Sequence, residues 1–279
     1  FQKGRISIDI SQSNPNVLYT RYADATGNIQ GVYKTTNGGD TWTAVNSSQL
    51  TDVGFHWWFG GIFIDPTDEN TIYNVDFEVQ KSTNGGVSWG NSFTNAHVDQ
   101  HALAFNASVP GEVLLGNDGG LYYSSNGGSS SVKNVKLPIT QFYRMHVDAQ
   151  NENKIYGGAQ DNSTSRTQTG GLTDWNIIYG GDGFQPLVDP TNTNVIYALY
   201  QYGSLGKSTN NGSSFSNATS GISGGDRKNW DTPITFDPSN SQTLYYGANR
   251  VYKTTNAAGN WAAISPDLTN GPHSGNLTY

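Results

Sequence analysis

The chain has 279 residues, a net charge of −7 and only 13% charged residues. No basic patch is visible, which makes nucleic acid a poor partner, and no apolar run approaches the length of about 18 residues that a membrane-spanning helix needs. Because the chain has no cysteine, it can form neither disulfides nor thiolate metal sites.

The composition is typical of a turn-dense β protein. Hydrophobic residues make up 34% of the chain, yet aromatic residues reach 12%, and 34 glycines accompany many Asn and Ser residues. Aromatic side chains suit short pleated strands, and Gly, Asn and Ser suit turns. The first residue is Phe, which suggests a processed chain or a fragment. The scarcity of lysine and the abundance of Asn, Thr and Ser favour an exported bacterial protein, secreted or at the cell surface.

One turn phrase recurs along the chain, as KTTNGGDTW at 34–42, KSTNGGVSW at 81–89, SSNGGSSS at 124–131, KSTNNGSSF at 207–215 and KTTNAAGNW at 253–261. The leading Asn residues are 47, 42, 84 and 46 positions apart. Because 84 is twice 42, we expect a further unit over 142–178, with TGGLTDW at 169–175 as a degenerate turn. A repeat of this length, with several short strands in each unit, predicts a β-propeller.

A second phrase marks the start of each unit, for example FIDPTDENTIYNV at 63–75 and LVDPTNTNVIYAL at 187–199. Its Asp-Pro and Asn residues between apolar runs predict a hairpin. With a third strand before the Asn-Gly turn and a fourth strand after it, each unit makes a four-stranded blade. We therefore expect an all-β protein, a single β-propeller domain over 1–279. Its blades are expected at 5–46, 56–93, 97–137, 141–178, 183–220 and 230–265, with 266–279 beginning a further blade or closing the ring. Six blades are visible, and we expect them to belong to a seven-bladed propeller.

The pattern Ser/Thr-x-Asn-x-Gly-x-x-Trp resembles the Asp-box, or BNR repeat. Together with GNDGGLYYSSNGG from Gly116, YGGAQDNSTS from Tyr156, YGGDGFQPLVDP from Tyr179 and NWAAISPDLT from Asn260, it makes nearly the whole chain resemble secreted Asp-box propellers of the xyloglucanase-like and sortilin-like group, common in Bacteroidetes-type bacteria. The resemblance implies that the turns are scaffold on the outer rim, that export uses type IX secretion, and that further domains belong to the same polypeptide. Classical sialidases also carry Asp-boxes, but Arg5 lacks the neighbouring proline expected there, which disfavours that class.

Ligand contact is expected at the mouth of the channel, where loops enter the innermost strands. Trp57 and Trp58 in the run FHWWF are expected to stack on sugar rings. The alternative is that strand alternation places one of them between blades and the other at the rim. Further ligand-binding residues are expected among the polar and aromatic residues of these loops, namely His56, Asp99, His101, Gln160, Asp226 and Trp230.

Glycoside hydrolysis needs two carboxyl groups, and three aspartates are candidates. Asp118 in GNDGGLYYS resembles the Asp-x-Gly-Gly phrase of the xyloglucanase-like enzymes, which use an Asp pair in a cleft between two propellers. Asp161 and Asp182 are the others, because acidic residues flanked by glycines can sit exposed at a mouth. The alternative for each of the three is a structural role, for Asp118 in an Asp-Gly hairpin turn.

No cofactor and no metal site is predicted, although two alternatives stay open. His97, Asp99 and His101 would share one face of a strand and carry groups that ligate transition metals. The acidic turn at 65–70 offers oxygen ligands for a structural calcium ion. The favoured function is binding of a polysaccharide or a protein at the channel mouth, without nucleic acid and without membrane insertion. The alternative is a glycoside hydrolase of the xyloglucanase-like type.

Overall fold

The computed structural model describes residues 3–137 and 139–269. Over these residues the chain forms six four-stranded antiparallel sheets and one short 3₁₀ helix, η1 (Gln201–Gly203). In every sheet, strands that are neighbours in space are consecutive in the sequence. This is the arrangement of propeller blades, and the chain is an all-β, multi-blade propeller protein, as predicted.

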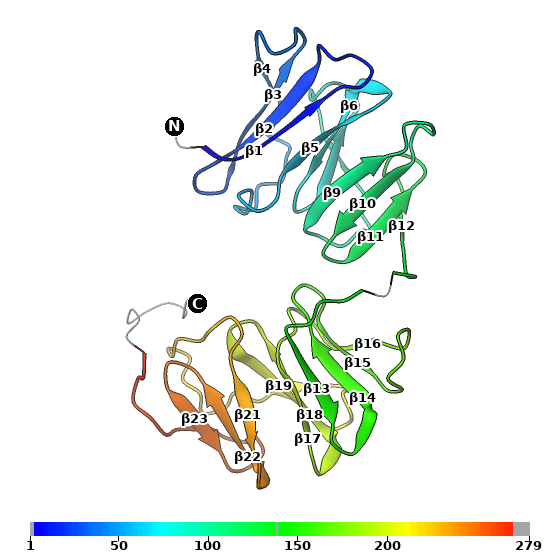
Figure 1. Cartoon of the computed structure of the whole chain (residues 1–279). Coiled ribbons are helices and arrows are strands. Elements are labelled where there is room, and N and C mark those ends of the chain that lie inside the picture. Colours follow the sequence, from blue (N-terminus) through cyan, green and yellow to red (C-terminus); the bar gives the residue numbers. More distant parts are fainter. Residues whose placement is uncertain (1–2, 138, 270–279) are drawn as a thin grey trace. The chain divides into compact units, whose positions relative to one another are not determined.

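Two compact units divide the chain, residues 1–137 and 138–279, and each contains three sheets (Figure 1). The sheets of the first unit are β1 (Lys3–Ile10), β2 (Leu18–Asp24), β3 (Ile29–Thr35) and β4 (Thr43–Val45); β5 (Gly61–Asp65), β6 (Asp68–Val75), β7 (Val79–Ser82) and β8 (Gly90–Ser92); and β9 (Gln100–Phe105), β10 (Val113–Asn117), β11 (Gly120–Ser124) and β12 (Val132–Lys133).

The second unit repeats the same plan. Its sheets are β13 (Arg144–Asp148), β14 (Asn151–Gly158), β15 (Thr164–Thr167) and β16 (Asn176–Tyr179); β17 (Pro186–Asp189), β18 (Asn192–Tyr200), β19 (Ser204–Ser208) and β20 (Ser216–Asn217); and β21 (Ile234–Asp237), β22 (Asn240–Gly247), β23 (Val251–Thr254) and β24 (Ala262–Ala263). Most of the expected further strand at 266–279 lies outside the described residues. No helix among the described residues is long and apolar enough to cross a membrane.

The predicted Asp-Pro hairpins join the first two strands of a blade. Asp65 Oδ1 accepts hydrogen bonds from the backbone N–H of Thr67 at 2.9 Å and from its hydroxyl at 2.7 Å, and Asp189 does the same with Thr191. These aspartates close the turn with their own side chains. In the acidic segment 65–70, the carboxylates of Asp65 and Asp68 both accept such local bonds.

The recurrent Asn turns join the third and fourth strands. In the first blade, the Thr35 hydroxyl donates to Asn37 Oδ1 at 2.8 Å and accepts from the backbone N–H of Gly39 at 3.1 Å. The backbone N–H of Thr41 donates to Asn37 Oδ1 at 3.0 Å. In the degenerate turn, Asp174 takes over, accepting from the Thr167 hydroxyl at 2.6 Å. The turns therefore serve as scaffold.

The hydrophobic core lies between neighbouring sheets of each unit. Tyr19 of β2 belongs to one buried cluster with Ile62 of β5, Ile72 of β6 and Trp89, which directly precedes β8. Within a unit, long polar side chains connect a sheet to the turn of its neighbour. Lys81 Nζ, for example, lies 5.1 Å from the centre of the Tyr73 ring and donates to the carbonyl of Gly127 at 3.1 Å. Desolvation by burial lowers the pKa of Lys81.

Candidate functional site

An aromatic loop, Phe55–Phe59, precedes β5 in the first unit. The backbone N–H groups of Trp58 and Phe59 both donate to the carbonyl of Phe55, at 2.8 and 3.1 Å, so the segment is a tight turn and not a strand. Trp57 and Trp58 are each 57% exposed, and their ring centres lie 6.1 Å apart. The interpretation based on strand alternation is therefore wrong, because neither indole is buried between blades.

His56 lies within the aromatic loop but is completely buried. Its Nδ1 is 2.6 Å from Arg21 Nη2 and 2.9 Å from Asp76 Oδ2, and its Nε2 is 3.0 Å from Asp52 Oδ1. Arg21 also donates to Asp76 Oδ2 at 2.5 Å. The prediction that His56 contacts ligand is wrong, since both ring nitrogens face protein groups. Its role is to anchor the loop.

The buried Arg21 at the centre of this cluster holds the loop in a second way. Gly60 has φ +106°, and a Cβ placed on it would lie 1.7 Å from Arg21 Nη1, so the loop passes directly over the guanidinium. Burial lowers the pKa of Arg21, and the charges of Asp76 and Asp52 oppose that shift. A buried charge of this kind persists because it is paired and hydrogen-bonded.

Two more contacts fix the backbone of the aromatic loop. The N–H of His56 donates to the carbonyl of Gly27 at 3.0 Å, and Arg5 Nη1 donates to the carbonyl of Trp58. The loop is therefore held at its backbone and through the buried side chains of His56 and Phe59, while its two indoles face outward.

A polar pair, His101 and Asp118, borders the aromatic loop. His101 lies on β9, and Asp118 lies in the two-residue hairpin between β10 and β11. His101 Nε2 is 2.6 Å from Asp118 Oδ1. The His101 ring centre is 5.5 Å from that of Phe59 and 6.4 Å from that of Trp58. Asp118 is thus both part of a hairpin turn and a half-exposed group beside the aromatic loop.

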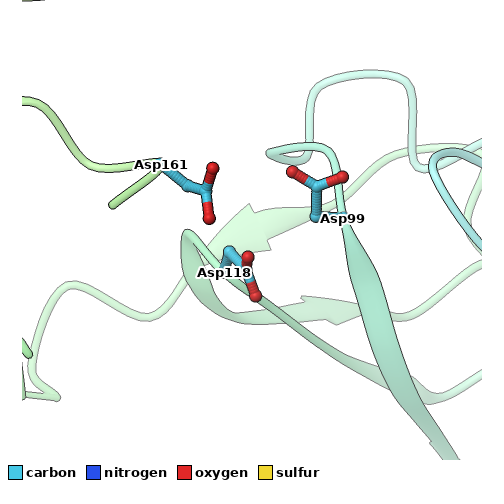
Figure 2. A group of neighbouring side chains, drawn as sticks. All are labelled: Asp99, Asp118 and Asp161. Carbon is cyan, nitrogen blue, oxygen red and sulfur yellow. The ribbon is translucent and has the colours of Figure 1, made fainter. Parts of the chain in front are cut away.

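Asp99 lies next to Asp118. The N–H of Asp118 donates to the carbonyl of Asp99 at 3.2 Å, and an oxygen of each carboxylate lies within 4.8 Å of the other. Figure 2 shows the two side chains, Asp99 just before β9 and Asp118 in its hairpin. Asp161, also drawn there, belongs to the second unit. Asp99 has φ +65°, a conformation that only a few per cent of non-glycine residues adopt.

The expected strand carrying His97, Asp99 and His101 on one face is wrong. β9 begins at Gln100, so only His101 belongs to it, and the positive φ of Asp99 breaks any alternation before it. His97 Nδ1 lies 2.8 Å from the carbonyl of Val98.

In the second unit, Asp182 is buried rather than exposed at a mouth. Its Oδ1 accepts from the backbone N–H of Asp161 at 2.7 Å, and its Oδ2 accepts from Gln201 Nε2 at 2.5 Å. The expectation of an exposed acid is wrong for Asp182, whose carboxylate holds two loops together. Asp161 itself is half-exposed, with φ +58°.

The remaining predicted ligand residues also lie in the second unit. Asp226 is largely enclosed, with Oδ2 accepting from the Tyr252 hydroxyl at 2.5 Å and lying 2.8 Å from Arg250 Nε; it acts as an internal partner. Trp230 is half-buried between Phe184 and Tyr202. Gln160 is exposed and accepts a hydrogen bond from the Tyr143 hydroxyl.

Comparison with known proteins finds no matching family model and no matching curated protein. Among solved structures, the chain is similar to the GH74 enzyme of Niastella koreensis, with 20% identity, a TM-score of 0.38, and coverage of 92% of this chain and 46% of that one. For the GH74 xyloglucanase of Xanthomonas campestris the values are 15%, 0.38, 95% and 47%. For YCF48 of Cyanidioschyzon merolae they are 14%, 0.35, 94% and 84%. The chain spans about half the length of the two GH74 enzymes. The propeller assignment itself rests on the six sheets described above.

Proposed function

We propose that the aromatic loop of the first unit binds carbohydrate. One observation carries this proposal: two neighbouring tryptophans, each 57% exposed, stand on a loop whose backbone is anchored. Large exposed aromatic groups that cluster on a surface mark interaction sites. The flat face of an indole matches the C–H face of a pyranose ring, so stacking the two removes apolar surface of both from water and stabilises the complex.

The anchoring of the loop favours binding. Because His56, Gly60 and the carbonyl of Trp58 are already held by Arg21, Asp76 and Arg5, little backbone freedom remains to be lost when a ligand binds. A preorganised surface gains affinity by avoiding that loss.

The polar pair supplies groups that neutral sugars need. A carboxylate accepts hydrogen bonds from hydroxyl groups, and an imidazole donates or accepts. His101 and Asp118 present both beside the aromatic loop, and the Asp118 carboxylate is only partly enclosed. A few such polar groups among aromatic side chains are typical of small-molecule sites.

As part of the same proposal, the protein is exported, secreted or on the cell surface, and its propeller belongs to a longer polypeptide. A chain without cysteine, poor in lysine and rich in turn-forming polar residues supports the location.

Affinity electrophoresis tests the binding proposal, with gels containing xyloglucan, mixed-linkage β-glucan or mannan. We expect at least one of these to retard the protein, and the variant carrying Trp57→Ala and Trp58→Ala to migrate as it does without polysaccharide. The matched control is Trp42→Ala, which removes a tryptophan that is 39% exposed in an Asn turn of the first blade and should leave retardation unchanged. Equal retardation of the double variant and the control contradicts the proposal. Binding of library peptides by the unaltered protein, with no retardation by any polysaccharide, contradicts it as well.

A second candidate function, glycoside hydrolysis, has one observation in its favour, the Asp99–Asp118 pair. Glycoside hydrolysis needs two carboxyl groups close to each other, and these two carboxylates have oxygens within 4.8 Å. Release of reducing ends from the same polysaccharides tests it. Loss of release in both Asp99→Asn and Asp118→Asn, but not in the exposed control Asp40→Asn, would assign the pair. No release by the unaltered protein leaves binding as the function.

A further inference from the structure

We infer that the second unit carries its own carbohydrate-binding surface, formed by Tyr143, Tyr202 and Trp230 and organised by the buried Asp182. This inference goes beyond the proposed function, because none of these residues belongs to the aromatic loop of the first unit. It rests on an aromatic chain, on a carboxylate that ties two loops together, and on the pairing of nearby charges.

The aromatic chain crosses the entrances to all three blades of the second unit. Tyr143 precedes β13 and stacks on Phe184, which precedes β17, with ring centres 5.4 Å apart and planes 11° apart. Phe184 then meets Trp230 edge to face at 5.6 Å, and Trp230, before β21, meets Tyr202 at 5.0 Å.

The ends of this chain are exposed and its centre is not. Tyr143 and Tyr202 are 40% and 42% exposed, whereas Phe184 is completely buried. Phe184 covers one face of the Tyr143 ring, and 40% of Tyr143 remains exposed beside that stack. Tyr143 is therefore a flat platform with its back supported, which is the arrangement that stacking on a sugar ring requires.

Asp182 connects the loops around this platform. Its two oxygens accept hydrogen bonds from the N–H of Asp161, in the loop after β14, and from the side chain of Gln201, in η1 after β18. Within these two loops Asp161, Ser163 and Tyr202 have φ of +58°, +69° and +52°. Non-glycine residues keep such conformations only where their surroundings enforce them, and these positions concentrate at ligand sites.

The surroundings favour an uncharged ligand. Arg144 is paired with Asp231 at 2.9 Å, and both Asp182 oxygens already accept hydrogen bonds. The exposed amide of Gln160 sits at the hydroxyl edge of Tyr143. An amide beside a supported aromatic face can exchange hydrogen bonds with sugar hydroxyls while the ring stacks. The chemistry therefore points to a neutral oligosaccharide.

Hydrogen–deuterium exchange on the full chain carrying Trp57→Ala and Trp58→Ala tests this inference, with xyloglucan, cello- and manno-oligosaccharides as probes. We expect at least one probe to slow amide exchange at 159–163 and 200–203. Adding Tyr143→Ala and Tyr202→Ala should weaken binding of that probe about tenfold or more, as truncation of aromatic anchors commonly does. The conservative Tyr143→Phe keeps the platform and should retain the affinity. Tyr123→Ala, at a tyrosine of the first unit that is also 40% exposed, is the matched control.

The outcomes separate the two sites. Slower amide exchange in the second unit of the variant that lacks Trp57 and Trp58 supports this inference. It does so even if the test of the first unit shows that Trp57 and Trp58 do not bind carbohydrate. If every probe loses its binding with Trp57 and Trp58, or if the tyrosine variants bind as tightly as the Tyr123→Ala control, the second surface does not exist. Protection of the same loops by peptides and by no sugar overturns the assignment to carbohydrate.

Discussion

At the scale of single residues, the recurrent turns show why the Asn side chain is accompanied by a hydroxyl group four residues later. Asn37 uses its Oδ1 as an acceptor within the turn, and its Nδ2 donates to the Thr41 hydroxyl at 2.9 Å. The same amide-to-hydroxyl bond recurs from Asn84 to Ser88 and from Asn126 to Ser130. An amide, unlike a carboxylate, brings donors that need an acceptor. The hydroxyl four residues later supplies it, which is why Ser or Thr accompanies Asn at this spacing.

The Ser or Thr two residues before the Asn of the turn phrase contributes more to the stability of the turn than its exposed neighbours do. Ser82 is buried, donates to Asn84 Oδ1 at 2.9 Å and accepts from the N–H of Gly86 at 2.9 Å. We expect Ser82→Ala to lower the free energy of unfolding by about 1–3 kcal/mol, because it leaves a buried N–H without a partner. Urea denaturation measures this, with the exposed neighbour Thr83→Ala as control. A loss no larger than that of the control would show that water replaces the hydroxyl.

At the scale of elements, the outer hairpin of one blade is also a contact for its neighbour. The N–H of Phe93, which follows β8, donates to the carbonyl of Gly128 in the next blade's Asn turn at 2.8 Å. Gly128 has φ +83°, and a Cβ on it would lie 2.1 Å from Ser92 Oγ and 2.6 Å from the Phe93 ring. The second glycine of this phrase therefore serves both the turn and the approach of neighbouring sheets.

Gly128→Ala should consequently destabilise the first unit more than a surface change does. Both the left-handed backbone and the overlap with Ser92 and Phe93 oppose the methyl group, and we expect a loss of about 1–3 kcal/mol. Gly90→Ala is the matched control, since nothing lies within 4 Å of a Cβ placed there. Thermal unfolding of the two variants compares them. Equal melting temperatures would mean that β8 moves aside at little cost.

The difference between contacts that are local in the sequence and contacts between distant residues explains how much of the structure could be predicted from the sequence. Hairpins and Asn turns are closed by side chains within a few residues of one another, so the repeat phrases predicted the four strands of each blade. The aromatic loop was harder, because nothing within FHWWF distinguishes a turn from a strand. The buried His56 contacts Arg21, which is 35 residues away in the sequence. The buried Asp182 accepts hydrogen bonds from Asp161 and Gln201, which are 21 and 19 residues away. Trp57 and Trp58 could be proposed as ligand residues from their chemistry alone, whereas the Tyr143–Phe184 stack needed three-dimensional contacts.

At the scale of the whole molecule, both units place tyrosines in their buried cores. The chain has 16 tyrosines, and Tyr19 and Tyr73 in the first unit, with Tyr197 and Tyr246 in the second, are almost completely buried. Burial raises the pKa of all four phenols well above the usual value, because the charged form would lose its hydration. The folded protein therefore contains several phenol groups that stay neutral in the folded state and ionise readily in the unfolded state.

This arrangement predicts a steep loss of stability at alkaline pH. In the unfolded chain the phenols lose their protons near pH ~10, while in the folded chain they keep them. Above that pH the unfolded state binds fewer protons, so the free energy of unfolding falls as pH rises. The near-ultraviolet absorbance of tyrosinate should rise in two steps, the second coinciding with the loss of the circular dichroism of the strands. Tyr197→Phe should move that second step to higher pH, because it removes one such group whose hydroxyl has no hydrogen-bond partner among the described residues. The partly exposed Tyr33→Phe should not move it. Ionisation of all tyrosines in a single step near pH ~10, with the circular dichroism unchanged, would show instead that water reaches the phenols in the folded state.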